Sequence, residues 1–270
     1  MNILAFHAIE RERRDPVSTV RAACDLNAAV ISERLFRGII TALAENGWRG
    51  MRLDQAMETD DPHVFALTVD DAQQSALSII LPACERLGWT GTVSTPVGLV
   101  GHSGKWDSGS LRNQRHLDWD ELQHMVHAGW EIGSHGVSHR ALTDMRPSEA
   151  RRELEASRDV LEQKLDVCVR SIAYPFGAVN TRVARMARDA GYEFGITMHP
   201  GKADERADAL RLPRWPVYWM DSPAHVLAKL CGPAWLRGLQ ITRDRLIQSF
   251  SRGTRVVMQG RSRIARTRSD

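Results

Sequence analysis

Short apolar runs alternate along this chain with longer segments in which apolar residues recur at the spacing of a helix. The apolar runs predict strands at residues 3–6, 64–69, 92–94, 131–133, 171–174 and 194–196. The longer segments predict helices at residues 33–46, 73–87, 119–128, 147–165 and 181–190, the first two ending at Gly47 and Gly88. Because strands and helices alternate, we expect an α/β fold of parallel strands with right-handed crossovers, as a barrel or an open doubly wound sheet.

Three polar clusters lie at the ends of predicted strands. Asp70 and Asp71 follow the strand at 64–69, the sequence SHGVSH follows the strand at 131–133, and YPFG covers the end of the strand at 171–174. In parallel α/β folds the carboxyl ends of the strands share one face, and that face carries the active site. We therefore expect these distant segments to converge on one functional site.

His135 and His139 have a spacing at which two imidazoles can bind one divalent metal ion, and an aspartate from a facing strand end would complete the set. Either feature alone has an ordinary explanation, since a histidine pair is often structural and the aspartate pair can cap the following helix. Adjacent carboxylates raise the cost of ionising both. A metal resolves this conflict, because Asp71 as a ligand leaves Asp70 to act as a base toward water.

The sequences LTVDDA, GWEIGSHGVSH and AYPFG, in this order, resemble the first three motifs of the polysaccharide deacetylase family, the NodB-like carbohydrate esterases of the family 4 type. The resemblance covers roughly residues 65–201, and ILAFHAI resembles the first strand of a subgroup. It implies a distorted (β/α) barrel that hydrolyses N-acetyl or O-acetyl groups on sugars. By position, it makes Asp70 the catalytic base and Asp71, His135 and His139 the ligands of one divalent metal ion. Zinc is the first choice, with cobalt, nickel, manganese and iron open.

The third motif departs from the family pattern, which often has an arginine before the proline. Ala173 stands where the family arginine would be expected. The Phe176 N–H can still stabilise an oxyanion, because that role needs only backbone. Arg214, expected after another strand near the end of the barrel, is the candidate replacement; an ordinary surface arginine is the alternative. The motif also suggests substrate contacts at Tyr174 and Pro175.

The general acid and the sugar platform are less clearly marked. Many family members end with a leucine-x-histidine motif, but residues 235–270 contain no histidine. His7 is the preferred acid because it ends the first predicted strand, ahead of His199 and then His225; a structural histidine is the alternative for each. Trp215, together with Tyr218 and Trp219, could form a saccharide-binding platform, although core packing is the commoner role of tryptophan.

Length and charge add two expectations. We assign residues 1–235 to one catalytic domain and residues 236–270 to a basic C-terminal extension, a helix followed by a disordered tail. Six arginines and no acid lie between residues 252 and 268, which predicts a solvated tail or a contact with an anionic membrane surface or polymer. No nucleic-acid partner is expected. The sequence does not indicate an oligomeric state.

The cysteines and the N-terminus indicate the compartment. Cys24, Cys84, Cys168 and Cys231 are far apart in the sequence, so we expect reduced and mostly buried thiols. The first residues lack the apolar core of a signal peptide, and no uncharged apolar segment is long enough to span a bilayer. These features predict a soluble, cytoplasmic protein.

Together these observations predict a metal-dependent deacetylase of an N-acetylated amino sugar in an oligosaccharide, polysaccharide or lipid-linked glycan. One rival keeps the fold but hydrolyses another C–N bond, in a cyclic amide or ureide. The intact set of metal ligands argues against it. A second rival is a non-catalytic saccharide-binding module, favoured by the missing arginine and late histidine but not by the retained base, Asp70.

Overall fold

A computed structural model describes residues 1–11, 28–103, 115–203 and 208–249 of the chain. Its main sheet contains these strands: β1 (Asn2–Phe6), β4 (Arg49–Met51), β5 (Val64–Val69), β6 (Thr92–Thr95), β7 (Glu131–Ser134), β8 (Ser171–Ala173), β9 (Phe194–Ile196) and β10 (Trp215–Pro216). All neighbouring strands are parallel, in the order β10-β1-β5-β6-β7-β8-β9, and β4 also pairs with β5. A small parallel pair, β2 (Ile9–Glu10) and β3 (Ile31–Ser32), lies beside it.

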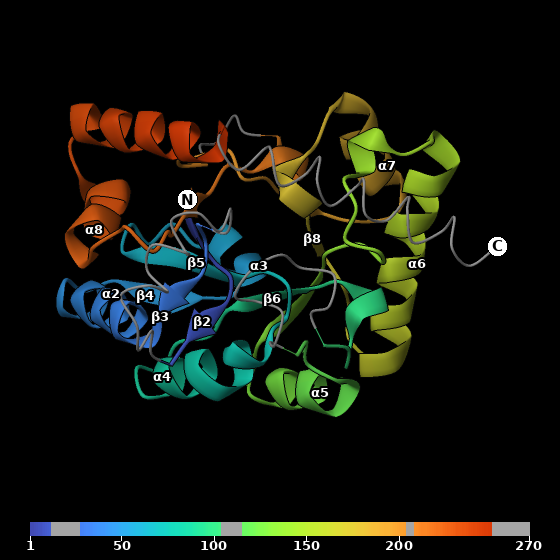
Figure 1. Cartoon of the computed structure of the whole chain (residues 1–270), viewed down its shortest axis with the longest axis horizontal. Helices are drawn as coiled ribbons and strands as arrows, with labels where there is room; N and C mark the ends of the chain where they lie inside the picture. Colours follow the sequence, from blue (N-terminus) through green and yellow to red (C-terminus); the bar gives the residue numbers. More distant parts are fainter. Residues whose placement is uncertain (12–27, 104–114, 204–207, 250–270) are drawn as a thin grey trace.

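The sheet curls into a distorted barrel, as the family resemblance implied (Figure 1). The segment between β9 and β10 connects the two ends of the sheet. Leu212 pairs with Ile196 of β9, and Trp215 pairs with Leu4 of β1. On this side of the barrel the described residues 212–216 therefore join the two ends of the sheet.

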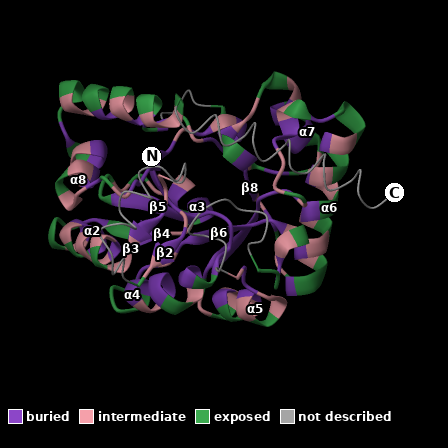
Figure 2. Ribbon diagram, viewed as in Figure 1, coloured by how far each residue is buried: buried purple, intermediate pink, exposed green. Residues whose placement is uncertain are grey.

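Helices cover the outside of the curled sheet, with their buried sides facing it (Figure 2). They are α2 (Glu33–Glu45), α3 (Leu53–Met57), the π-helical η1 (Ala76–Ile80), α4 (Leu81–Glu85), α5 (Trp119–His127), α6 (Pro147–Leu165), α7 (Thr181–Asp189) and α8 (Pro223–Cys231). Residues 234–249 are also helical. Short 3₁₀ turns are η2 (Val97–Leu99), η4 (Leu142–Asp144), η5 (Pro175–Gly177) and η6 (Ala209–Arg211). Polar caps define helix starts; Asp118, for example, forms a reciprocal capping box with Glu121.

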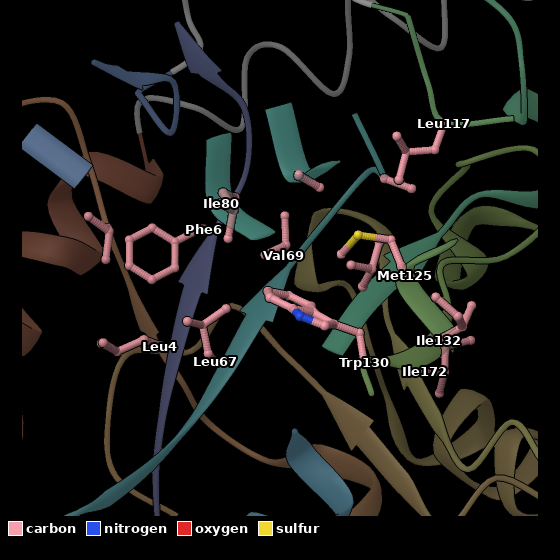
Figure 3. Packing of buried hydrophobic residues seen from close by; sticks show 14 of the residues in the cluster. Leu4, Phe6, Leu67, Val69, Ile80, Leu117, Met125, Trp130, Ile132 and Ile172 are labelled. Carbon is pink, nitrogen blue, oxygen red and sulfur yellow. The ribbon is translucent and has the colours of Figure 1, made fainter. Parts of the chain in front are cut away.

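The apolar core lies between the sheet and these helices (Figure 3). Leu4, Leu67 and Ile132 come from three different strands of the sheet, and Ile80 and Met125 come from the helices that pack on it. Fully burying one such side chain contributes roughly 1.5–3 kcal/mol to stability. This packing holds the strand ends, and the loops that follow them, in fixed positions.

The cysteine prediction was only partly correct. Cys84 is a buried free thiol, whereas Cys168 and Cys231 are free but exposed. Cys24 and the basic segment 252–268 lie outside the described residues. None of the helices in the described part of the chain is both long and apolar enough to cross a membrane.

Candidate active site

The predicted site residues lie together after the carboxyl ends of the strands. His7 follows β1, Asp70 and Asp71 follow β5, His135 follows β7, and Phe176 lies in η5 directly after β8. These strands are parallel, so their ends meet at one edge of the barrel. The convergence expected from the sequence is therefore present.

Asp71, His135 and His139 form a compact group of possible metal ligands. The Asp71 Oδ1 atom lies 3.5 Å from His135 Nε2 and 3.3 Å from His139 Nε2, and the three ligand atoms lie within 4.8 Å of one another. Ligand atoms about 2.0–2.2 Å from a cation, at tetrahedral angles, lie about 3.3–3.6 Å apart. The two distances from Asp71 and the two-nitrogen, one-oxygen donor set therefore fit a single divalent cation.

Contacts around His135 orient its imidazole for this role. Its Nδ1 lies 2.6 Å from the Ala173 carbonyl oxygen, so Nδ1 carries the proton and Nε2 is left with a lone pair toward Asp71. Burial lowers the pKa of His135 and lowers the pKa of His139 well below its ordinary value. Both imidazoles are therefore neutral, which is the form that binds a metal.

The loop that carries the two histidines is held by α6. The Glu153 carboxylate accepts hydrogen bonds from the backbone N–H groups of Val137 at 2.8 Å and Ser138 at 2.9 Å, and from the Ser138 hydroxyl at 2.6 Å. His139 itself has a φ of 51°, which is sparsely populated for a residue with a side chain and persists only when neighbouring contacts hold it. Glu153 supplies such contacts one residue away.

Asp70 pairs with Arg214 rather than with the histidines of the ligand group. Arg214 Nη1 donates to Asp70 Oδ1 at 2.9 Å, and Nη2 donates to Oδ2. Both side chains are buried, and Arg214 Nε also donates to the Thr197 carbonyl oxygen at 2.8 Å. Burial acts to raise the pKa of Asp70, but the Arg214 guanidinium outweighs it and holds the pKa below its usual range. Asp70 is therefore an ionised base.

The surface-arginine alternative for Arg214 is excluded by this burial. The expectation that Arg214 follows a strand was wrong, since it directly precedes β10. The guanidinium reaches Asp70 because β10 pairs with β1 and β1 pairs with β5, which carries Asp70 at its end.

His7 is the histidine that faces Asp70. Its Nε2 lies 3.7 Å from Asp70 Oδ2, and its side chain is 19% exposed. Burial lowers the pKa of His7 to about 4, although the charge of Asp70 opposes this. His225 instead lies on α8 with its side chain half exposed, near Asp221. The geometry thus favours His7 over His225.

Comparison with known proteins places the chain in a family. The family model for polysaccharide deacetylases matches residues 57–195, the part that contains Asp70, Asp71, His135, His139 and the third motif. The chain belongs to the polysaccharide deacetylase family. A metal site is accordingly expected of it, and the donor set formed by Asp71, His135 and His139 fits one.

Individual polysaccharide deacetylases resemble the chain over most of its length. YxkH of Bacillus subtilis, which carries the family's name, is 22% identical over 74% of this chain and 70% of its own. The poly-β-1,6-N-acetyl-D-glucosamine N-deacetylase of Staphylococcus epidermidis is 21% identical over 78% of this chain and 76% of its own. The structure of Streptococcus pyogenes deacetylase PplD has a TM-score of 0.72 and 22% identity, covering 86% of this chain and 98% of that one.

The third motif of this polysaccharide deacetylase, AYPFG, contains two aromatic residues, Tyr174 and Phe176. Of these two, only Phe176 lies next to the metal-ligand group. Phe176 is exposed, and its ring centroid lies 5.0 Å from that of His139. Its φ is 59°, so the backbone turns sharply at this residue. Pro175 is buried, and its ring packs near Gly136 of the ligand loop. The expectation of a direct substrate contact thus fits Phe176 better than Pro175.

Tyr174 and Trp215 do not face a substrate, which corrects the sequence-based expectation. Both are fully buried; the Tyr174 hydroxyl donates to the Leu210 carbonyl oxygen at 3.0 Å, and Trp215 Nε1 donates to Asn2 Oδ1 at 3.2 Å. Their polar atoms are used inside the protein, and their ring faces pack in the core. Neither ring is available as a saccharide platform.

Two residues at the site of this deacetylase were missed by sequence reasoning. Glu153 holds the ligand loop, and buried His116 lies with Nδ1 2.6 Å from the Asp71 carbonyl oxygen. Glu153 is one of several acids on α6 and His116 follows no predicted strand, so neither carries a local signal. Only the three-dimensional structure brings them to the metal-ligand group.

Proposed function

We propose that this protein hydrolyses the acetamide of an N-acetylated amino sugar in an oligosaccharide, polysaccharide or lipid-linked glycan, with one divalent metal ion as cofactor. One observation carries the proposal. A buried, arginine-paired carboxylate, Asp70, lies directly beside three converging ligand atoms from Asp71, His135 and His139. Amide hydrolysis needs a base beside an electrophilic centre, and this arrangement supplies both positions.

Zinc is our first candidate for the metal. Two imidazole nitrogens and one carboxylate oxygen, with further positions open, form the donor set of catalytic zinc sites. When bound, the cation would act as a Lewis acid toward the acetyl carbonyl and would lower the pKa of water at the site. The same donors accept cobalt, nickel, manganese and iron, so metal content needs direct measurement.

Asp70 is proposed as the general base. The Arg214 guanidinium keeps the carboxylate ionised and fixes both of its oxygens. An ionised carboxylate in a fixed orientation can take a proton from water as the water attacks the acetyl carbon. Arg214 thereby performs the positioning role that an arginine of the third motif performs in many relatives.

His7 and Phe176 are proposed to complete the reaction. Because burial lowers the pKa of His7 to about 4, its imidazole is neutral at neutral pH and must gain a proton before it can donate one. Asp70 Oδ2, 3.7 Å from His7 Nε2, can supply the proton that it has taken from water. His7 then protonates the departing amine, while the Phe176 N–H donates to the oxyanion.

Amino sugars are the preferred substrate class. The Staphylococcus epidermidis relative is named for poly-β-1,6-N-acetyl-D-glucosamine, which makes this linkage a natural test compound. The exposed Phe176 ring beside His139 offers an apolar surface on which a sugar ring or an acetyl methyl group can pack.

The test is acetate release from β-1,4- and β-1,6-linked N-acetylglucosamine oligomers by the purified protein. We expect acetate release that is abolished by chelation and restored by adding back zinc. Release that continues unchanged after complete removal of metal would refute the metal-dependent mechanism. A protein with stoichiometric metal that binds oligomers but releases no acetate would instead be the saccharide-binding module.

A further inference from the structure

The helix at residues 234–249 presents apolar side chains to solvent. Trp235, Leu239 and Leu246 are 68%, 58% and 57% exposed. Their spacing of four and seven residues places them along one side of the helix. Figure 2 colours the outer side of this helix, which lies above α8, as largely exposed. We call these three side chains the apolar stripe.

The opposite side of the same helix is polar and buried. Asp244 is fully buried, and its carboxylate oxygen lies 3.0 Å from Lys229 Nζ of α8. Gln240 is also buried, and Gln248 Nε2 donates to the Met198 carbonyl oxygen at 2.5 Å. Turning the apolar stripe inward would break a buried ion pair and leave its charges unpaired, which is strongly unfavourable. The structure therefore fixes the stripe on the outside.

The charge around the stripe selects the kind of surface that could cover it. Arg245 lies next to Leu246 on the same helix, and residues 236–270 together contain nine arginines against two aspartates. The whole chain has a net charge of only +3, so the remainder is net acidic. A partner for this region must be both anionic and apolar. A polyanion would engage only the arginines, whereas an anionic membrane surface engages the arginines and the stripe together.

We propose that the apolar stripe and the net positive charge of the C-terminal region that carries it dock this protein on the surface of an anionic phospholipid membrane. The arginines attract the helix to the lipid headgroups, and Trp235, Leu239 and Leu246 enter the boundary between headgroups and acyl chains. The docking does not depend on the proposed deacetylase activity.

The helix at residues 234–249 lies close to the candidate active site. Gln248 binds the carbonyl of Met198, and the Met198 sulfur lies 3.2 Å from Arg214 Nη2, which holds Asp70. Two residues, Met198 and Arg214, thus separate the helix from the catalytic base. Docking through this helix would place the active site near a glycan held at the membrane, such as a lipid-linked one. This choice of substrate rests on the proposed function.

The test is co-sedimentation of the full chain with phosphatidylcholine vesicles, with and without phosphatidylglycerol. We expect binding only to the anionic vesicles, weakened by salt because headgroup attraction is screened. Replacing the stripe (Trp235→Ser, Leu239→Ser, Leu246→Ser) should reduce binding roughly tenfold or more. The matched control is Leu87→Ser, which removes an exposed leucine two residues after the end of α4, outside the stripe. This variant should bind like the wild type.

Two outcomes would overturn the proposal. If the stripe variant binds anionic vesicles as well as the wild type, only the arginines act, or the stripe is covered by a second copy or by the chain's own tail. If sedimentation shows a dimer that dissociates in the stripe variant, the stripe is a self-association surface. Circular dichroism and acetate release from soluble oligomers, unchanged in the variant, would show that fold and catalysis are unaffected.

Discussion

Asp70 and Asp71 are neighbours in the chain but contact different partners. Asp71 has a φ of 70° and Ala72 a φ of 46°, so the backbone turns immediately after β5. The turn directs the Asp71 carboxylate to the two histidines while Asp70 remains on Arg214. The sequence could predict two roles for two adjacent carboxylates, because like charges need separate partners. It could not show the backbone conformation that separates them.

Replacing Asp70 with asparagine should nearly abolish hydrolysis and leave metal binding almost unchanged. The amide cannot accept the proton from water, and loss of a general base lowers rates roughly 10²–10⁴-fold. The measurements are kcat/KM for acetate release and the metal content of the purified variant. Asp120→Asn, an exposed change on α5, is the control. Full turnover in the Asp70 variant would mean that another group is the base.

Arg214→Lys should lower kcat at least roughly tenfold, because lysine keeps one positive charge but cannot bind both oxygens of Asp70 in a bidentate geometry. The KM for oligomers should change little, since Arg214 is buried behind Asp70. Steady-state kinetics of acetate release will separate the two constants. Arg188→Lys changes an exposed arginine on α7 and should leave both constants unchanged. A rise in KM with unchanged kcat would contradict a positioning role for Arg214.

At the scale of elements, the ligand loop depends on α6. The loop contributes His135 and His139, and three of its hydrogen-bond donors converge on Glu153. Helix α6 belongs to the outer layer of helices, and the Glu153 side chain reaches from it to the ligand loop. We therefore expect a substitution in this outer helix to alter the affinity of the site for metal.

Glu153→Ala should weaken metal binding about tenfold or more, as is typical when groups that orient ligands are lost. Without the Glu153 carboxylate, Ser138 loses the hydrogen bonds that help to keep the next residue, His139, in its strained backbone conformation. Competition with a chromogenic chelator measures the affinity, and circular dichroism confirms the fold. Glu155→Ala, two residues along the same helix, should bind metal like the wild type. Equal affinities for all three proteins would show that Glu153 does not position the ligands.

The sequence predicted the strands that contain apolar runs and the periodic helices well, and it missed β4 and β10. β5, β9 and α6 have the predicted bounds, because continuous apolar runs and helical periodicity mark them. β4 consists of Arg49, Gly50 and Met51, and β10 of Trp215 and Pro216, so neither contains an apolar run that marks a strand. The predicted helix at 73–87 is π-helical over η1, between α-helical residues on both sides, and no periodicity distinguishes this stretch.

Side-chain direction was the main obstacle at the site. The positions of Asp70, Asp71, His135 and His139 follow from motif spacing and from strand ends that share one edge. Trp215 follows Arg214 directly and Tyr174 lies two positions before Phe176, yet both rings point into the core. At Phe176 the backbone turns with a φ of 59°, so its ring leaves the direction of Tyr174. Proximity in the sequence therefore does not indicate exposure.

At the scale of the whole molecule, a buried charge cluster ties the last helix to the barrel. Lys229 Nζ lies 3.1 Å from Asp221 and 3.0 Å from Asp244, and it donates to the Pro216 carbonyl oxygen of β10 at 2.6 Å. Arg243 also pairs with Asp221. The cluster therefore connects three segments: β10, α8 and the helix at 234–249.

Lys229→Met should lower the free energy of unfolding by about 3–5 kcal/mol, because it leaves Asp244 and Asp221 buried with less compensating charge. Urea denaturation followed by circular dichroism measures the change. Lys202→Met, at an exposed position, should have almost no effect and serves as the control. A loss below about 1 kcal/mol, the value typical of surface pairs, would mean that water or rearrangement compensates for the lysine.

The strand order also affects how the protein is made on the ribosome. β1 is synthesised first, yet it lies between β5 and β10, and β10 consists of residues 215 and 216. At about 5–20 residues per second, roughly 10 to 40 s separate the synthesis of β1 from that of β10. During this interval one edge of β1 has no partner strand, and unpaired edges promote aggregation. We therefore expect the chain to be most prone to aggregation in the interval before β10 has left the ribosome and paired with β1.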